Sequence, residues 1–207
     1  PVPVRAIDVK NLCELHVLRE DNGRVVIGAG ITHAALRRSE LIQRAVPALA
    51  EAAATVGGGQ IQAMGTIAGS IANASPAGDL APTLLASEAR VVVASVRGER
   101  ELPLTAFILG YRKIDLAPDE LIVRFLVPAR RDGEREAFRK LGPRAAQAIS
   151  KIMGSYRGAV RDGVITSFAV ALGSVAPTAI RLPDVERAVT GQPLTEATIA
   201  RAEQVAA

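Results

Sequence analysis

The chain has 207 residues, of which 49% are hydrophobic, 22% charged and 3% aromatic, and its formal net charge is +4. This composition excludes a disordered or collagen-like chain, and the length allows one large domain or two small ones. The single cysteine, Cys13, excludes an intramolecular disulfide, a multi-cysteine zinc site and an iron–sulfur cluster held by this chain alone. A lone thiol fits a cytoplasmic protein, and without a long uncharged apolar run we expect no membrane span.

The first predicted elements are a strand and two helices. A β-branched run predicts a strand over residues 25–28. Thr32 is expected to cap a helix over residues 34–44, and Pro47 to lie in the first turn of a second helix over residues 47–54.

Gly28 and Gly30 follow the first strand as they would in a dinucleotide fingerprint. The third glycine is absent, because His33 takes its place, and no acidic residue follows about 20 residues later. We therefore interpret this segment as a structural turn, with His33 on the surface. Cys13 and His16 are too weak a pair for catalysis, and we expect the first in the core and the second on the surface.

Charge is missing from the next segment. Between Glu51 and Glu88 the only ionisable residue is Asp79, although the segment is rich in glycine, serine, threonine and asparagine. We expect residues 57–74 to form extended strands and turns. Two interpretations stay open: a tightly packed β region with glycines at its bulges, or a cradle of backbone N–H groups for a dinucleotide, with Asp79 accepting hydrogen bonds from ribose hydroxyls.

The rest of the chain predicts an α+β protein in two parts. The elements expected are a short helix or turn over residues 82–87, a hairpin of strands over 90–96 and 101–104, a strand over 121–127, a hairpin of strands over 148–160 and 164–172 around Asp162-Gly163, and helices over 184–190 and 195–206, the last capped by Thr195. The composition shift near residue 130 predicts domains over residues 1–129 and 130–207.

Basic residues are densest between Arg130 and Arg144, which raises the alternative of nucleic-acid binding. Acidic residues interrupt this stretch, and Phe138 is its only aromatic residue. Since single-strand binders need stacking aromatics beside a positive groove, we interpret the stretch as a solvated hairpin and expect no nucleic-acid partner.

The glycine-rich run GGGQIQAMGTIAGSIANASPAGDLAP resembles a signature of the FAD-binding, or medium, subunits of the molybdenum hydroxylase family, the xanthine dehydrogenase and carbon monoxide dehydrogenase type. Three further segments resemble family blocks in the same order: RVVIGAGITHAAL, LPLTAFILGYRKIDLAPDELIVRFLVP and FRKLGPRAAQAISKI. The resemblance implies two small α/β subdomains that hold FAD, followed by an α+β flavoprotein C-terminal domain on a three-stranded sheet. It also implies partners: a molybdenum-cofactor-binding large subunit and an iron–sulfur small subunit, with NAD or another acceptor receiving the electrons.

The resemblance implies FAD contacts at the positions that match the family motifs. Asp79 is expected on the ribose or ribityl hydroxyls, Ile122 near a flavin or adenine ring, and Lys140 beside the flavin. No residue is expected to be catalytic in its own right or to bind a metal. The full set of expected FAD contacts is Gly57, Gly58, Ile61, Gly65, Thr66, Gly69, Ser70, Asn73, Gly78, Asp79, Ile122 and Lys140.

The sequence departs from the family pattern in two ways. Ala68-Gly69 stands where the family has two glycines, and Ser70 where it has asparagine. The family's earlier pyrophosphate loop is not found after Pro1, so we expect an FAD-binding fold truncated at its N-terminus and a C-terminal domain that stops early. This motivates the alternative of a non-catalytic assembly subunit, or a degenerate member that no longer binds FAD.

Overall fold

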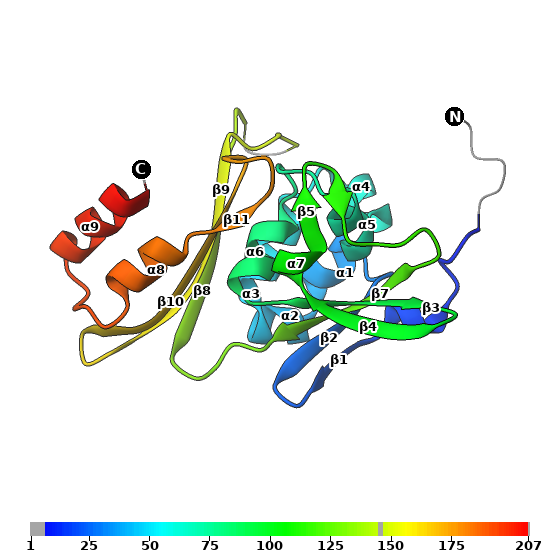
Figure 1. Cartoon of the computed structure of the whole chain (residues 1–207), viewed down its shortest axis with the longest axis horizontal. Helices are drawn as coiled ribbons and strands as arrows, with labels where there is room; N and C mark the ends of the chain where they lie inside the picture. The colour runs from blue at the N-terminus through cyan, green and yellow to red at the C-terminus, as the bar shows by residue number, and fades with distance from the viewer. Residues whose placement is uncertain (1–6, 145–146, 207) are drawn as a thin grey trace.

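The computed structural model describes residues 7–144 and 147–206; positions 145 and 146, inside the FRKLGPRAAQAISKI segment, lie outside the described residues. The described chain forms two antiparallel sheets with helices between them (Figure 1). The first is five-stranded in the order β1-β2-β7-β3-β4, with β1 Leu18–Asp21, β2 Arg24–Gly28, β7 Leu121–Pro128, β3 Arg90–Ser95 and β4 Gly98–Pro103. The second is four-stranded in the order β11-β10-β9-β8, with β11 Ile180–Arg181, β10 Val164–Gly173, β9 Ile152–Arg161 and β8 Glu134–Leu141.

The helices are short and lie mostly between the sheets. A 3-10 turn, η1 (Cys13–His16), precedes β1, and the short strands β5 (Ile108–Gly110) and β6 (Lys113–Ile114) form a small separate hairpin. Helices α8 and α9 lie on the far side of the four-stranded sheet (Figure 1). The helices are α1 His33–Arg38, α2 Glu40–Ala45, α3 Pro47–Ala54, α4 Gly59–Met64, α5 Ile67–Ala72, α6 Leu80–Ala86, α7 Leu104–Phe107, α8 Pro183–Val189 and α9 Glu196–Ala206.

Local sequence signals account for several of these elements. Thr32 caps α1 by accepting a hydrogen bond from the Ala35 amide at 3.2 Å, and Thr195 accepts one from the Thr198 amide at 3.3 Å before α9. Asp162 and Gly163 both adopt positive φ angles, 50° and 77°, which is the backbone of a tight hairpin turn between β9 and β10. The predicted strands outside residues 57–74, their hairpins and the C-terminal helices are confirmed, with shifted ends. The second sheet has four strands instead of the three expected, because β11 pairs with β10.

Two predicted segments differ in structure. The single helix expected over residues 34–44 is two helices, because Ser39 adopts an extended backbone and its hydroxyl caps α2 by accepting from the Ile42 amide at 3.3 Å. The strands expected over residues 57–74 are the helices α4 and α5. Gly58 and Gly65 occupy the N-cap and C-cap of α4, so these glycines mark the ends of a helix and not bulges in strands.

Two burial predictions are also wrong. Cys13 is exposed, because only Leu15 of η1 faces the core. His33 is buried, with 3% of its surface exposed, because its ring packs against Gly65, which has no side chain to keep it out. His16 is exposed, as predicted.

Helix α6 joins the two halves of the molecule. Every one of its residues is buried, because the helix packs against β9, β10 and β11 of one sheet and against α3, α5 and α7 of the other half. A helix that is apolar all round is typical of such a fully enclosed position. Phe138, Met153 and Ala171 of the four-stranded sheet accordingly belong to the same hydrophobic core as Phe107 and Phe125.

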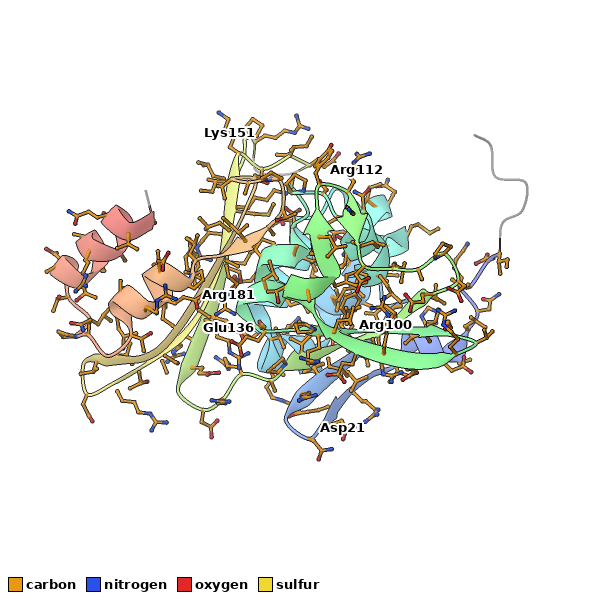
Figure 2. All side chains as sticks on the ribbon, viewed as in Figure 1. Asp21, Arg100, Arg112, Glu136, Lys151 and Arg181 are labelled. Atoms are coloured by element: carbon orange, nitrogen blue, oxygen red, sulfur yellow. The ribbon has the colours of Figure 1, made fainter. Side chains whose placement is uncertain are left out.

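A buried arginine fixes the linker between the sheets. Arg157 on β9 donates hydrogen bonds to the carbonyl oxygens of Pro128 and Ala129, at 2.9 and 2.7 Å, and forms an ion pair with Glu134 at 2.7 Å. Its Nε also lies 3.6 Å from Glu136 Oε1, an oxygen that accepts no hydrogen bond from the described residues. Figure 2 shows Glu136 where the second sheet meets the helices of the first half.

Glu136→Gln is expected to make the protein less sensitive to rising pH. Burial raises the pKa of Glu136 above its ordinary value near 4.5, which the charge of Arg157 only partly opposes. The folded state therefore binds this proton more tightly than the unfolded state, and its contribution to stability is lost as the pH rises through the folded pKa. Gln cannot titrate, and Arg157 keeps Glu134 as its partner. In urea unfolding, the free energy of unfolding of Glu136→Gln minus that of the wild type should increase from pH 4 to pH 7. A constant or decreasing difference would contradict the raised pKa of Glu136.

Candidate functional site

The glycine-rich segment forms a surface made of α4, α5 and the turns around them. Gly57 adopts a positive φ of 49°, which lets the chain turn sharply between α3 and α4. A Cβ atom at Gly57 would lie 2.9 Å from the Cβ of Ile61, so only glycine allows this turn to pack on α4. Ile61 itself is 57% exposed on the outer side of that helix.

The next two expected contacts are held by local hydrogen bonds. The carbonyl oxygen of Gly65 accepts from the His33 amide at 3.0 Å, which ties the segment to the start of α1. The Thr66 hydroxyl caps α5 by accepting from the Gly69 amide at 3.1 Å. Around this cap Gly69 is exposed and Ser70 is half-buried, so their backbone is accessible from outside.

Asp79 and Lys140 form a buried ion pair. Lys140 Nζ lies 2.8 Å from Asp79 Oδ2, and the two side chains are 12% and 7% exposed. The same ammonium donates to the carbonyl oxygen of Thr55 at 3.3 Å, at the end of α3. Burial raises the pKa of Asp79 above its ordinary value, against the opposing effect of Lys140. The pair therefore joins β8 of the second sheet to the glycine-rich segment.

A cavity of about 330 Å³ opens beside this ion pair. Lys140 and Thr55 form one side of it, and the connection between β8 and β9 forms the other. Gly58 is a neighbour of one lining residue, because a Cβ atom at Gly58 would lie 3.2 Å from Gln147 Nε2. The described lining residues are Thr55, Lys140, Leu141, Gly142, Arg144, Gln147 and Ala148.

These residues fit one end of a flavin dinucleotide. The accessible backbone around Gly58 and Gly69 allows close approach of an extended ligand. Lys140 uses two of its three N–H donors on described residues, which leaves one for a ligand in the cavity. Asp79 Oδ1 is buried without a hydrogen-bond partner among the described residues, a further acceptor in the same cluster.

Of the expected FAD contacts, Lys140 alone is among the described residues that line this cavity. Ile122 is 3% exposed on β7 and packs inside the core beside β3, so its contact with a ring stays a prediction. Ser70 and Gly78 share a much smaller cavity on the other side of α5. Asn73 is exposed at the end of α5.

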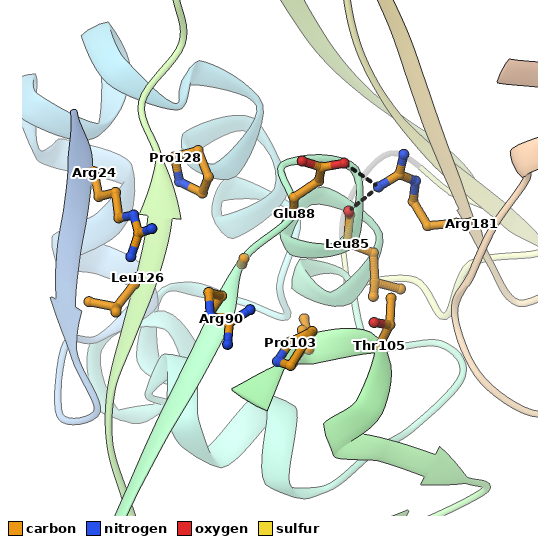
Figure 3. Close-up of a pocket in the computed structure, with 11 residues that line it drawn as sticks. Arg24, Leu85, Glu88, Arg90, Pro103, Thr105, Leu126, Pro128 and Arg181 are labelled. Atoms are coloured by element: carbon orange, nitrogen blue, oxygen red, sulfur yellow. Dashed lines mark hydrogen bonds and ion pairs between the residues drawn. The ribbon is translucent and has the colours of Figure 1, made fainter. Parts of the chain in front are cut away.

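A second cavity, of about 400 Å³, lies at the seam between the two sheets (Figure 3). Arginines line it, but each has a carboxylate nearby. Arg181 is paired with Glu186 at 2.7 Å, and Arg90 and Arg24 both lie by Glu101. Because these charges are already compensated, this cavity is a weaker candidate for an anionic ligand than the one beside Lys140.

Other kinds of site find little support in residues 7–144 and 147–206. No group of three or more His, Cys, Asp or Glu side chains in this part of the chain is arranged to hold a metal ion. No helix there is both long and apolar enough to cross a membrane. In the basic stretch, Arg139 lies 3.7 Å from Glu51, and Lys140 is the buried partner of Asp79.

Sequence reasoning missed Thr55 and Gln62, which both contribute to the site. Thr55 acts through its carbonyl oxygen, which no side-chain pattern reveals. Gln62 is the one buried residue of α4, and its amide contacts the α3–α4 turn. A signal was present in the sequence, because Gln62 lies inside the glycine-rich family signature, but its hydrogen-bond partners come from two other segments.

Comparison with known proteins identifies the same architecture. A family described as the FAD binding domain in molybdopterin dehydrogenase matches residues 2–130, and the CO dehydrogenase flavoprotein C-terminal domain matches residues 136–207. The nicotinate dehydrogenase FAD-subunit of Eubacterium barkeri is 34% identical over 201 residues, which cover 95% of this chain and 68% of that protein. The carbon monoxide dehydrogenase medium chain of Hydrogenophaga pseudoflava is 31% identical, over 99% of this chain and 71% of that one.

A solved structure agrees with the sequence comparison. A chain of the Hydrogenophaga pseudoflava carbon monoxide dehydrogenase that lacks the Mo-pyranopterin moiety superposes with a TM-score of 0.92 at 32% identity, over 96% of this chain and 69% of that one. Both matched domains, the sequence relatives and this structure agree on one family. The chain belongs to the FAD-binding subunits of the molybdenum hydroxylases, the oxidoreductase family of the xanthine and carbon monoxide dehydrogenase flavoproteins.

Proposed function

We propose that this chain binds FAD against the glycine-rich segment and Lys140, and serves as the electron-transfer link of a molybdenum-containing hydroxylase. The observation that carries the proposal is the buried Lys140–Asp79 pair, whose lysine lines a cavity beside the glycine-rich segment: Gln147 in the cavity wall lies next to Gly58. FAD, when bound, supplies the redox chemistry that takes electrons from iron–sulfur clusters in a partner and passes them to NAD or another acceptor.

The chain's own residues would bind FAD and orient it. The backbone around Gly57, Gly58 and Gly69 would admit the extended ligand without a Cβ in its way. The Lys140 ammonium would face the cavity, where a fixed cation favours a ligand that gains negative charge on reduction. Asp79 would hold that ammonium in place, since Asp79 pairs with Lys140 but is not among the residues that line the cavity.

The relatives support the proposed partners. Their names describe an FAD-subunit and a medium chain, which are components of larger complexes. We therefore propose a molybdenum-cofactor-binding large subunit and an iron–sulfur small subunit as the partners of this chain, in the cytoplasm. The division into domains over residues 1–129 and 130–207 belongs to the same proposal and is supported by the linker that Arg157 fixes between the two sheets.

Titration of the purified chain with FAD tests the proposal. Bound flavin should give a visible absorption spectrum after removal of free FAD, and its fluorescence should change on binding. Absence of bound flavin after incubation would overturn the proposal and favour the alternative, a non-catalytic assembly subunit. Salt-sensitive binding of an oligonucleotide would instead support the nucleic-acid alternative.

Gly58→Val is expected to weaken FAD binding about tenfold or more, because the new side chain would cover the Gly58 backbone and push Gln147, which lines the cavity; tenfold corresponds to about 1.4 kcal/mol. Only the flexible end of Gln147 must move, so the free energy of unfolding should change by less than about 1 kcal/mol. Gly110→Val is the matched control, since Gly110 lies on β5 and a Cβ there would meet no atom within 4 Å. Equal FAD affinities for both variants and the wild type would remove Gly58 from the site.

A further inference from the structure

Gln62 is a buried amide in a helix that is otherwise exposed on its outer side. It is 5% exposed, whereas Ile61 and Met64 of the same six-residue helix are 57% and 69% exposed. An amide side chain with no water around it is stable only when its donors and acceptor find partners. The burial of Gln62 therefore requires specific contacts inside the protein.

All of those contacts are present. Gln62 Nε2 donates to the carbonyl oxygens of Ala54 and Val56, at 3.0 and 3.1 Å, and Gln62 Oε1 accepts from Arg37 Nη1 at 3.0 Å. The guanidinium can only donate and the two carbonyls can only accept, so these partners fix which way the amide points. Glutamate could satisfy Arg37, but it would place a carboxylate oxygen against two carbonyl oxygens.

The two carbonyls mark the place where α3 becomes the glycine turn. Ala54 is the last residue of α3, and Val56 immediately precedes Gly57. Carbonyl oxygens at a helix C-terminus have no hydrogen-bond donor within the helix, and the Gln62 amide supplies that donor. The residue between them, Thr55, gives its own carbonyl oxygen to Lys140 Nζ at 3.3 Å.

The geometry points to Gln62 as a positioning residue for the cofactor site, held in turn by Arg37. It fixes the backbone of residues 55–58, the segment that carries Gly57 and Gly58 and the Thr55 carbonyl oxygen to which Lys140 donates. This inference rests on the proposed FAD site, but the clamp itself is a property of the chain and is measurable without FAD.

Two measurements on Gln62→Glu test the clamp. The amides of Thr55 and Val56, which bond to Ala52 and Ala53 at the end of α3, should exchange with solvent about tenfold faster, while amides of β3 should keep wild-type rates. FAD affinity should fall about tenfold, in line with the loss of two hydrogen bonds that shape the turn. Arg37→Met changes an exposed residue and leaves both N–H donors of Gln62 in place. It should raise the same exchange rates and lower the FAD affinity by only about threefold.

Gln43→Glu is the matched control. Gln43 is exposed, and its Nε2 donates to a backbone carbonyl oxygen, that of Arg37, at 2.9 Å, but it does not contact the turn. Wild-type exchange at Thr55 and Val56 is expected in this variant. If Gln62→Glu also left both exchange and FAD affinity unchanged, the positioning role would be overturned. If the wild type bound no FAD, the proposed function would fail, while the exchange rates would still decide whether Gln62 holds the turn.

Discussion

Lys140→Met is expected to lower the free energy of unfolding by about 3 kcal/mol at pH 7, although the substitution preserves the length and much of the shape of the side chain. The reason is the partner left behind. Asp79 is 7% exposed, its Oδ1 already lacks a hydrogen bond among the described residues, and Lys140 is the cation that faces its Oδ2 at 2.8 Å. Removing one member of a buried pair leaves an uncompensated charge in a place that water does not reach.

The loss of unfolding free energy in Lys140→Met should become smaller as the pH falls. Burial already raises the pKa of Asp79 above its ordinary value near 3.8, and Lys140 is what opposes the shift. Without Lys140 the folded state binds the proton more tightly still, so protonation restores stability below the folded pKa and the loss is complete only above it. Denaturant unfolding at pH 4 and pH 7 measures the difference.

An exposed ion pair provides the control for this prediction. Arg187 and Asp184 lie on the outer surface of α8, with side chains 72% and 75% exposed, so Arg187→Met should cost less than about 1 kcal/mol. The double variant Asp79→Leu/Lys140→Met should recover much of the lost stability without FAD binding. A Lys140→Met loss no larger than that of Arg187→Met would mean that water reaches the pair.

Sequence signals predicted those parts of the fold in which the backbone conformation depends only on residues close together in the sequence. The Asp162-Gly163 turn needs only two residues that tolerate positive φ, and the cap at Thr32 needs one hydroxyl and one amide. The sequence predicts strands and turns over residues 57–74, with glycines at the bulges. The structure shows that most glycines of this segment lie at helix ends instead, where glycine costs little.

Burial and pairing were harder to predict, because they depend on residues distant in the chain. His33 is buried because Gly65 gives its ring room, and Cys13 is exposed because its short turn presents only Leu15 to the core. The family resemblance places Asp79 on the ribose or ribityl hydroxyls and Lys140 beside the flavin. Their contact with each other, across 61 positions of sequence, depends on the packing of β8 against α3 and of α6 against β9, which no local signal predicts.

Arg157→Met should cost about 3 to 5 kcal/mol of unfolding free energy, the largest effect that we expect from a single substitution outside the candidate site. Arg157 is 10% exposed and faces two carboxylates, Glu134 and Glu136, whose side chains are 12% and 1% exposed. It also donates to the carbonyl oxygens of Pro128 and Ala129. Methionine fills the space of the aliphatic stem but supplies no donor and no charge. Glu134 and the two carbonyl oxygens therefore lose a hydrogen-bond donor, and Glu136 loses the cation beside it.

The pH dependence of this loss separates the charge from the packing. Burial alone would raise the pKa of Glu134, but the Arg131 amide and Arg157 hold it below its ordinary value near 4.5. A depressed pKa contributes stability that is present above the unfolded pKa and lost as the pH falls, so the wild type loses this advantage in acid and the gap to Arg157→Met should narrow toward pH 4. A gap of equal size at pH 4 and pH 7 would assign the effect to packing alone.

Arg157→Lys separates the charge from the geometry of the guanidinium. Lysine restores a cation near Glu134 and Glu136, but a single ammonium cannot reach two carboxylates and the carbonyls of Pro128 and Ala129 from one position. The expected loss of unfolding free energy is therefore intermediate, about 1 to 3 kcal/mol.

Adding Glu136→Gln to Arg157→Met should return more stability than Glu136→Gln gives in the wild type, because it removes a buried charge that has lost its cation. Additive effects would mean that Arg157 fixes the linker through its carbonyl contacts, with no energetic coupling to the glutamate.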